Sequence, residues 1–264
     1  MSANTTFQLV NEQGWRRGFV NLFRHENAIW WRSRRWWINT LVWLILINGA
    51  VLAALSSTDT SAGPLLDESI MVFAVLAGLF GTIGAIIATQ GSIIDEKKSG
   101  TAAWIMSKPA SRPAFILAKL VANMLALFVI ILVIQGAVAY VQFSQAKGSP
   151  LPLGAFLGGM ALYGLNMLFY VSFTLMLGTL FSDRGPVLAI PIGLLFSPMF
   201  ILNYVGQAAY LLPWPLIPSS GDPGLAAQLM MGQPLSTTMP IVATIVWIVV
   251  FIAVALWRFG REEF

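Results

Sequence analysis

The residues able to carry out acid–base, nucleophilic or metal chemistry are few in this chain, and they lack a catalytic arrangement. Its 264 residues include no cysteine and a single histidine, His25, which excludes thiol nucleophiles, cysteine-ligated zinc and multi-histidine metal sites. Neither a GxxxxGK[ST] phosphate loop nor an HExxH zinc motif occurs, and Asp95 and Glu96 have no partner at a catalytic spacing. We therefore expect no catalysis, metal or cofactor on this chain.

One short segment nevertheless combines charged flanks with an apolar centre. Within Asp95–Lys119 the order is Asp-Glu-Lys-Lys-Ser-Gly-Thr-Ala-Ala-Trp-Ile-Met-Ser-Lys-Pro-Ala-Ser-Arg-Pro, followed by Ala-Phe-Ile-Leu-Ala-Lys. Thr101 is placed to cap a short helix in which Trp104, Ile105 and Met106 form an apolar knob. An ordinary charged loop needs no apolar turn between a Gly-Thr start and a Pro-x-Ser-Arg stop. The pattern therefore favours a surface that docks a partner protein.

The elements that hold this segment are membrane spans. Hydrophobic residues make up 57% of the chain and charged residues only 10%, whereas a soluble domain has about 25% charged residues. Stretches without Asp, Glu, Lys or Arg run over 36–58, 69–94, 120–146, 148–182, 185–221 and 223–257. Each is long enough for the roughly 20 helical residues that cross a hydrocarbon core. We expect an all-α integral membrane protein with six transmembrane helices near 36–55, 69–92, 118–142, 154–180, 187–204 and 239–257.

The distribution of basic residues predicts the topology. If the N-terminal arm, the 95–119 segment, the Asp183–Arg184 turn and the C-terminal tail lie inside, Lys147 is the only one of the 15 basic residues outside. Positive charge concentrates on the cytoplasmic side of membrane proteins. We therefore expect both termini to be cytoplasmic, with a cytoplasmic loop at about 94–117.

Two further segments complete the expected domain organisation. Residues 1–35 form a cytoplasmic arm with an amphipathic interfacial helix, and residues 36–264 form the six-span domain. The apolar residues of that helix recur at helical spacing and alternate with arginines, as in helices that lie in the membrane interface. The outer loop at about 205–238 is rich in proline but only weakly polar, so we expect it to be semi-buried. The interfacial helix includes Trp15, Phe19, Leu22, Phe23, Ile29 and Trp30, with Arg16, Arg17 and Arg24 between them.

Polar, small and kink-forming residues within the spans are candidates for a transport path or a dimer seam. The polar ones also suit hydrogen bonds between helices, and a stripe of small residues every four positions suits close packing within one subunit. Packing is the favoured interpretation of the stripe, and prolines in the fifth span predict a kink there. The candidate residues are Asn48, Ala77, Gly81, Ala85, Thr89, Pro191 and Pro198.

The 95–119 segment resembles the first cytoplasmic loop of membrane-spanning permease subunits of ATP-binding-cassette transporters, in the type 2 exporter class. That loop has Glu-x-x-x-Gly-Thr, about seven mostly apolar residues, Pro-x-Ser-Arg and a lysine entering the next span. An amphipathic helix containing Arg24-His25-Glu26, six spans and a semi-buried outer loop extend the resemblance over nearly the whole chain. Ala102 and Ala103 depart from the Leu-Glu that many members have after Gly-Thr. The matching positions are Glu96, Gly100, Thr101, Pro109, Ser111, Arg112 and Lys119.

The resemblance implies a specific set of partners. The interfacial helix and the loop would dock on a separate nucleotide-binding ATPase subunit, which carries the ATP and Mg, and two permeases, identical or paralogous, would form the path with their first, second and fifth spans. Membrane lipid is an expected partner and nucleic acid is not, and the expected location is the plasma (inner) membrane of a prokaryote. The expected interfacial-helix residues are Trp15, Phe19, Arg24 and Glu26. The expected ATPase-coupling residues are Glu96, Gly100, Thr101, Trp104, Pro109, Ser111 and Arg112.

Two alternative functions stay open at this stage. The same loop would serve a non-transporting subunit that relays ATPase-driven motion to a periplasmic or lipid partner. A membrane-embedded enzyme acting on lipid ranks last, because Asp95, Glu96 and His25 lack catalytic partners. The sequence specifies neither the substrate nor the second permease.

Overall fold

The computed structural model describes residues 14–56, 65–219 and 221–262, and these residues form helices and turns without a strand. Residues 1–13 of the expected arm lie outside the described residues. Among the described helices, five runs are long and apolar enough to cross a membrane. They are Trp36–Leu55, Leu65–Lys98, Arg112–Lys147, Leu153–Leu180 and Met239–Gly260.

Each of the first three spans contains a π-helical segment between two α-helical parts. A π-helical segment has hydrogen bonds between residues five apart, and such segments occur mostly as short insertions within α-helices. In the third span, the Gln135 side-chain Nε2 donates to the Ile130 carbonyl oxygen at 2.9 Å. The parts are α2 (Arg35–Trp43), η2 (Leu44–Asn48) and α3 (Gly49–Leu55); α4 (Leu65–Phe73), η3 (Ala74–Phe80) and α5 (Gly81–Thr89); α8 (Arg112–Leu127), η4 (Phe128–Val133) and α9 (Ile134–Lys147).

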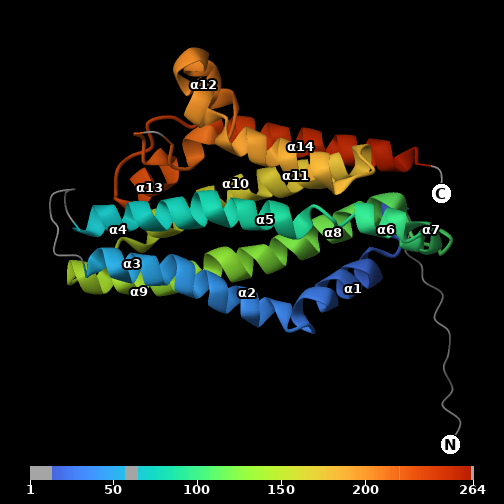
Figure 1. Ribbon diagram of the computed structural model, residues 1–264, viewed down its shortest axis with the longest axis horizontal. Helices are drawn as coiled ribbons and strands as arrows, with labels where there is room; N and C mark the ends of the chain where they lie inside the picture. The colour runs from blue at the N-terminus through green and yellow to red at the C-terminus, as the bar shows by residue number, and fades with distance from the viewer. Residues whose placement is uncertain (1–13, 57–64, 220, 263–264) are drawn as a thin grey trace, which may run out of the picture.

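The fifth predicted span, at 187–204, is divided into α11 (Arg184–Phe196) and α12 (Pro198–Val205), and Figure 1 shows α12 standing out of the bundle. With 13 residues, α11 is about 20 Å long, less than the roughly 30 Å hydrocarbon core. Pro198 has no N–H for the Leu194 carbonyl oxygen four residues earlier. That oxygen instead accepts a bond from the Trp214 indole Nε1 at 3.0 Å. The break is therefore stabilised by a residue from the following loop.

That following loop is helical and partly buried. It contains η5 (Gly206–Leu211), η6 (Trp214–Leu216) and α13 (Gly224–Met230), and it leads into α14 (Met239–Gly260). The α13 helix lies so close to α10 (Leu153–Leu180) that a Cβ at Gly159 would be 2.6 Å from the Ala226 carbonyl oxygen. Glycine is thus needed on α10 for this approach.

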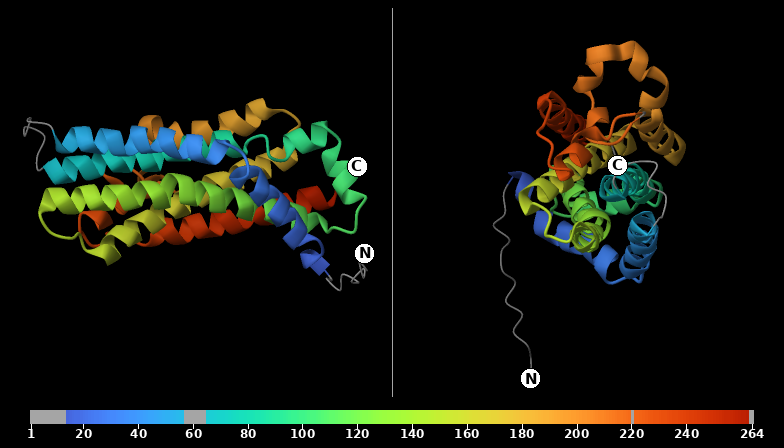
Figure 2. Two further views of the ribbon diagram at one scale, coloured as in Figure 1. Left: turned by 90° about the horizontal axis from the view of Figure 1, so that it is seen from below. Right: turned by 90° about the vertical axis from the view of Figure 1, so that its left-hand side faces the viewer.

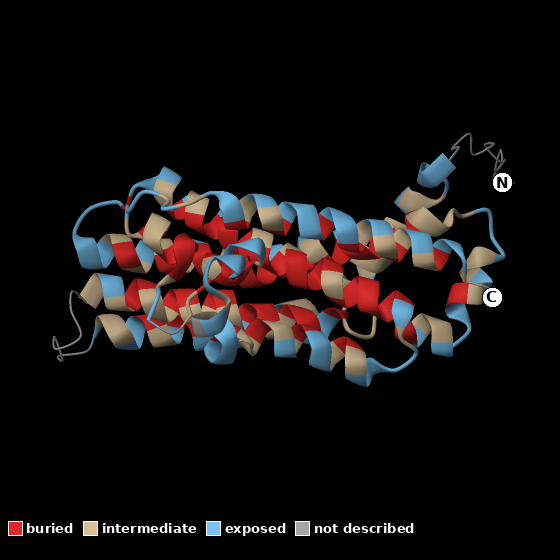
Figure 3. Cartoon of the chain, turned by 90° about the horizontal axis from the view of Figure 1, so that it is seen from above, coloured by how far each residue is buried: buried red, intermediate tan, exposed pale blue. Residues whose placement is uncertain are grey.

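The bundle is arranged around α10, most of whose residues are buried, and the end-on view in Figure 2 shows the other long helices around it. Figure 3 shows that buried residues follow the inside of the bundle and exposed residues its outside. Large apolar side chains on the outside remain exposed, among them Ile45 (70%) and Phe200 (75%). An outer surface of this kind suits contact with lipid acyl chains.

Four short elements gather at one end of the bundle (Figure 1). They are η1 (Gly14–Arg16), α1 (Phe19–Trp31), α6 (Ile94–Lys98) and α7 (Thr101–Met106). The α1 helix packs along α8, and the described C-terminus lies at this same end. The 95–119 segment, which contains α6 and α7, therefore lies among elements from both ends of the chain.

Candidate functional site

The turn between α6 and α7 depends on Gly100. Its φ of +73° lies in the left-handed region, which glycine adopts without the steric cost of a Cβ. The prediction that Thr101 caps α7 is wrong, because the cap position is Gly100 and no side chain caps it. The Thr101 N–H is instead 3.4 Å from the Ser99 hydroxyl oxygen, which also lies 2.8 Å from the Thr101 hydroxyl.

The apolar knob expected on α7 is reduced to one side chain. Trp104 is 63% exposed, and the Lys108 Nζ lies 4.5 Å from its ring centroid. Ile105 and Met106 turn inward and pack against the hydrophobic core. The solvent-facing surface of α7 therefore presents a large aromatic ring beside a positive charge.

The Pro-x-Ser-Arg sequence that follows α7 connects the 95–119 segment to the N-terminal helices by hydrogen bonds. Ser111 caps α8 by accepting from the Ala114 N–H at 3.2 Å, while its hydroxyl donates to the Trp15 carbonyl oxygen at 2.7 Å. The Ser111 N–H donates to the Arg17 carbonyl oxygen at 2.9 Å. Gly18 has a φ of +80°, and a Cβ there would lie 3.1 Å from the Ala110 side chain. The two chain segments thus meet at close range.

Four consecutive charged residues on α6 pair with residues from other parts of the fold. Asp95 binds Arg184 at the start of α11 at 2.6 Å, Glu96 binds Lys119 on α8 at 2.6 Å, Lys97 binds Glu262 beyond α14 at 2.7 Å, and Lys98 binds Asp183 at 2.7 Å. The Asp95 and Lys98 pairs are well exposed, so each contributes at most about 1 kcal/mol to stability. Together the four pairs connect α6 with α8, with the start of α11 and with Glu262 after α14.

Lys119 is the buried centre of these contacts. Its side chain is 2% exposed, and its Nζ lies 2.6 Å from Oε1 of Glu26 and 2.6 Å from Oε1 of Glu96. The same Nζ is 5.0 Å from the Phe115 ring, which stacks on Phe259 of α14 with centroids 5.0 Å apart. A buried charge needs such partners, since an unpaired one is very costly in a low-dielectric interior. One cation thus links α1, α6 and α8.

A family model described as ABC-2 family transporter protein matches residues 20–264. The chain belongs to this ABC-2 transporter family. The match begins within α1 and covers all the spans and the α6–α7 segment. No curated protein matches the chain.

In this ABC-2 chain, the predicted coupling residues divide into two groups by exposure. Gly100, Thr101, Trp104 and Pro109 are exposed on the α6–α7 segment. The other three are half-buried and engaged within the chain: Glu96 binds Lys119, Ser111 binds the carbonyl of Trp15, and the Arg112 Nη1 donates to the Gly260 carbonyl oxygen at 2.5 Å. The first group is therefore accessible to a partner, and the second connects that surface to the bundle.

The predicted interfacial-helix residues also differ in exposure: some face solvent and one turns into the fold. Trp15 is 50% exposed and contacts the Phe19 ring edge to face at 6.1 Å. Arg24 is exposed, whereas Glu26 turns inward to Lys119. Arg24 and the neighbouring His25 therefore face outward, whereas the Glu26 carboxylate belongs to the buried cluster.

The candidates for a path or dimer seam are mostly packed inside this chain. Asn48 is buried and its Nδ2 donates to Gln135 Oε1 at 2.9 Å. The stripe Ala77, Gly81, Ala85 and Thr89 is buried, and a Cβ on Gly81 would lie 2.8 Å from Ile131. This placement agrees with packing of the stripe within one subunit. Pro191 is buried within α11, and Pro198 begins α12.

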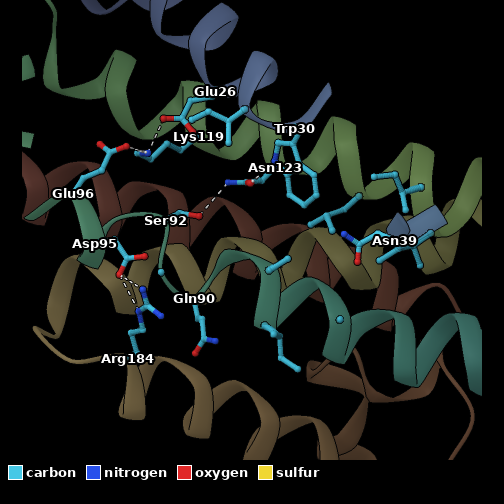
Figure 4. A pocket seen from close by; sticks show the side chains of 18 of the residues that line it. Glu26, Trp30, Asn39, Gln90, Ser92, Asp95, Glu96, Lys119, Asn123 and Arg184 are labelled. Carbon is cyan, nitrogen blue, oxygen red and sulfur yellow. Dashed lines mark hydrogen bonds and ion pairs between the residues drawn. The ribbon is translucent and has the colours of Figure 1, made fainter. Parts of the chain in front are cut away.

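The carboxylate partners of Lys119 are the contacts that sequence reasoning missed. A lone lysine at the start of an apolar span was the available signal, because such a residue needs an acidic partner. Beside this cluster lies a pocket of about 740 Å³, whose labelled lining residues are drawn in Figure 4. No cluster of three or more histidine, aspartate or glutamate residues able to hold a metal occurs within the described ranges.

Proposed function

We propose that the chain is the permease subunit of an ATP-driven exporter, coupled to a separate ATPase subunit through α6 and α7. The ATPase would carry the ATP and Mg, and a second permease, identical or paralogous, would complete the transport path. Membership of the ABC-2 family supports the transport role. The coupling element, the export direction and the assembly go beyond family membership and form the rest of the proposal.

One observation carries the coupling role. The α6–α7 segment exposes Trp104 to solvent, while the four charges of α6 bind α8, the start of α11 and the residues after α14. An exposed tryptophan is typical of interface hot spots. A push on α7 would therefore reach several spans through α6, as coupling to an ATPase requires.

We further propose six membrane crossings with both termini in the cytoplasm of a prokaryote. The α14 helix packs along α10, and between these two spans the chain runs through α11, α12 and α13, which supports a further crossing there. The α11 helix makes the first part of that crossing and α12 to α13 the remainder. The end bearing α6, α7 and the described C-terminus carries most of the basic residues, in agreement with the positive-inside rule.

The experiment is to extract the tagged chain from its native membrane in mild detergent and to compare wild type with Trp104→Ala. Trp257→Ala is the matched control, because Trp257 is also exposed (55%) but lies on α14. Co-purified proteins are identified by mass spectrometry, and ATP hydrolysis of each preparation is measured. Size-exclusion chromatography checks that all three chains are folded.

The proposal requires an ATPase to co-purify with wild type and with Trp257→Ala. Loss of a hot-spot side chain costs about 2 kcal/mol or more, which weakens binding roughly thirtyfold, so Trp104→Ala should lose most of the ATPase and its hydrolysis. Equal ATPase recovery in all three preparations would refute docking through α7. Absence of an ATPase from the wild-type preparation would refute the permease assignment.

A further inference from the structure

A group of cations without acidic partners lies where the chain enters its first span. Residues 14–38 contain six arginines but only one acid, Glu26, and that acid is bound to the buried Lys119. Five of the arginines are exposed, and none of the five forms an ion pair within the described ranges. A surface with this excess of positive charge attracts an anionic partner. The five are Arg16, Arg17, Arg24, Arg32 and Arg34.

The α1–α2 junction (residues 32–34) carries two of these arginines. Trp31 on α1 and Trp36 on α2 pack across the junction with ring centroids 5.9 Å apart. The Arg32 N–H donates to the Ala28 carbonyl oxygen at 3.0 Å and so continues the hydrogen bonding of α1. The backbone that carries Arg32 and Arg34 is therefore held by contacts on both sides.

Exposed apolar side chains lie directly after these two charges. The Ile38 N–H is 3.3 Å from the Arg34 carbonyl oxygen, so Arg34 and Ile38 are one helical turn apart and share a face. Ile38 and its neighbour Trp37 are 45% and 43% exposed. Cations next to an indole ring and an aliphatic side chain are typical of the boundary between lipid head groups and acyl chains. Lipid supplies a partner for both parts of this surface.

The depth of the junction agrees with that boundary. The Trp30 indole Nε1 donates to Asn123 Oδ1 on α8 at 3.0 Å, and Figure 4 shows the two side chains next to each other. Asn123 is one turn beyond Lys119, the last charged residue before the uncharged stretch 120–146. In Figure 1 and in the left view of Figure 2, the junction is set back along the bundle from the end that bears α7. The junction therefore lies level with the edge of the hydrocarbon core, away from the segment proposed to dock the ATPase.

We propose that Arg32 and Arg34 bind the phosphate group of an anionic membrane lipid, whose acyl chains lie along Trp37 and Ile38. A guanidinium group matches a phosphate through two parallel N–H···O bonds. A helix that only lies in the interface needs no particular head group, whereas arginines without acidic partners select a lipid with net negative charge. The surface belongs to a single chain, so this proposal holds or fails independently of export, ATPase coupling and a second permease.

The test measures which lipid the purified chain retains in native mass spectrometry, without ATPase or nucleotide. Phosphatidylglycerol, which is anionic, competes with an equal amount of phosphatidylcholine of identical acyl chains, which has no net charge. The junction variant, Arg32→Gln with Arg34→Gln, removes both cations. The control variant is Lys108→Gln with Arg261→Gln, because it removes the same charge from two exposed positions. Lys108 lies over the Trp104 ring of α7.

The second control position is also distant from the junction. Arg261 follows Gly260, whose carbonyl oxygen accepts from Arg112 at the start of α8. Arg112 precedes Asn123 by 11 residues, which is about 16 Å of helix. This length exceeds the distance of about 10 Å over which 0.1 M salt screens a charge. The control should therefore have little effect on a lipid bound at the junction.

Each arginine beside an anionic surface strengthens binding about fivefold. The junction variant should therefore lower the ratio of retained phosphatidylglycerol to phosphatidylcholine about thirtyfold. Wild type and the control variant should both prefer phosphatidylglycerol, with ratios within about twofold of each other. Arg32→Lys with Arg34→Lys keeps both charges and should keep most of the preference. Size-exclusion chromatography checks that each chain is monodisperse.

Four results would overturn the proposal. A wild-type ratio near one would reject the anionic head group, and an equal fall in the junction and control variants would reject the location. Displacement of the retained lipid by an equal concentration of glycerophosphoglycerol, which has no acyl chains, would reject membrane lipid as the source. An unchanged ratio in the junction variant would reject the role of the two arginines, and loss of a co-purifying ATPase from that same variant would show that they dock the ATPase instead.

Discussion

Replacing the buried lysine should damage the fold more than replacing either of its carboxylate partners. Lys119 lies 2.6 Å from both Glu26 and Glu96 and is 2% exposed. Lys119→Met keeps a similar volume but leaves two carboxylates close together without their cation. Glu26→Gln, in contrast, leaves Lys119 paired with Glu96. The two substitutions should differ in their effect on stability because two carboxylates share one lysine cation.

The expected magnitudes differ severalfold. Removing one partner from a buried ion pair costs about 3–5 kcal/mol, because the remaining charge stays desolvated. We expect Lys119→Met to fall in that range, whereas Glu26→Gln should cost about 1–2 kcal/mol for one weakened charged hydrogen bond. At about 2–4 °C per kcal/mol for a chain of this size, the Tm should fall by about 10 °C in the first case. The second variant should lose about 2–8 °C.

The assay is thermal unfolding in detergent, followed by tryptophan fluorescence, with size-exclusion chromatography before and after heating. The triple variant Lys119→Met, Glu26→Gln, Glu96→Gln is the control, because replacing a whole buried charge cluster by neutral groups is often close to neutral. It should recover most of the lost Tm. An equal fall for Lys119→Met and Glu26→Gln, or a triple variant as unstable as Lys119→Met, would refute the electrostatic reasoning.

Three further predictions concern backbone and packing. Gly100→Ala should lower the free energy of unfolding by about 1 kcal/mol, because an alanine is strained at the positive φ of this position. If denaturant unfolding gives the same free energy for the variant and wild type, the turn geometry is contradicted. A Cβ on Gly84 would overlap the Trp43 ring, so Gly84→Ala should cost about 1–3 kcal/mol in thermal unfolding; a stabilised variant would show that the ring moves freely. Asn48→Leu should cost about 0.6 kcal/mol, the average for a hydrogen bond between membrane helices. Gln135→Leu should cost more, because Gln135 also donates to backbone carbonyls, and a double-mutant cycle gives the coupling between the two.

Much of the membrane architecture could be predicted from the sequence. A hydrocarbon environment requires each span to satisfy its own backbone hydrogen bonds, so long uncharged runs become helices. This reasoning placed five runs that the structure has as long apolar helices. The expected span at 187–204 is not confirmed, because the described chain divides there into α11 and α12. The division lies at Pro198, one of the prolines that predicted a kink, and Trp214 supplies a hydrogen bond to the Leu194 carbonyl oxygen.

The sequence by itself determined where the apolar helices lie and that residues 95–119 form a distinct charged and apolar segment, because both follow from local composition. Only the tertiary structure decided which residues that segment contacts. Glu26 is 93 positions from Lys119, and Asp95 is 89 positions from Arg184, and no spacing rule connects such pairs. A buried lysine indicates that acids must be near, but the packing of α1, α6 and α8 selects which acids they are.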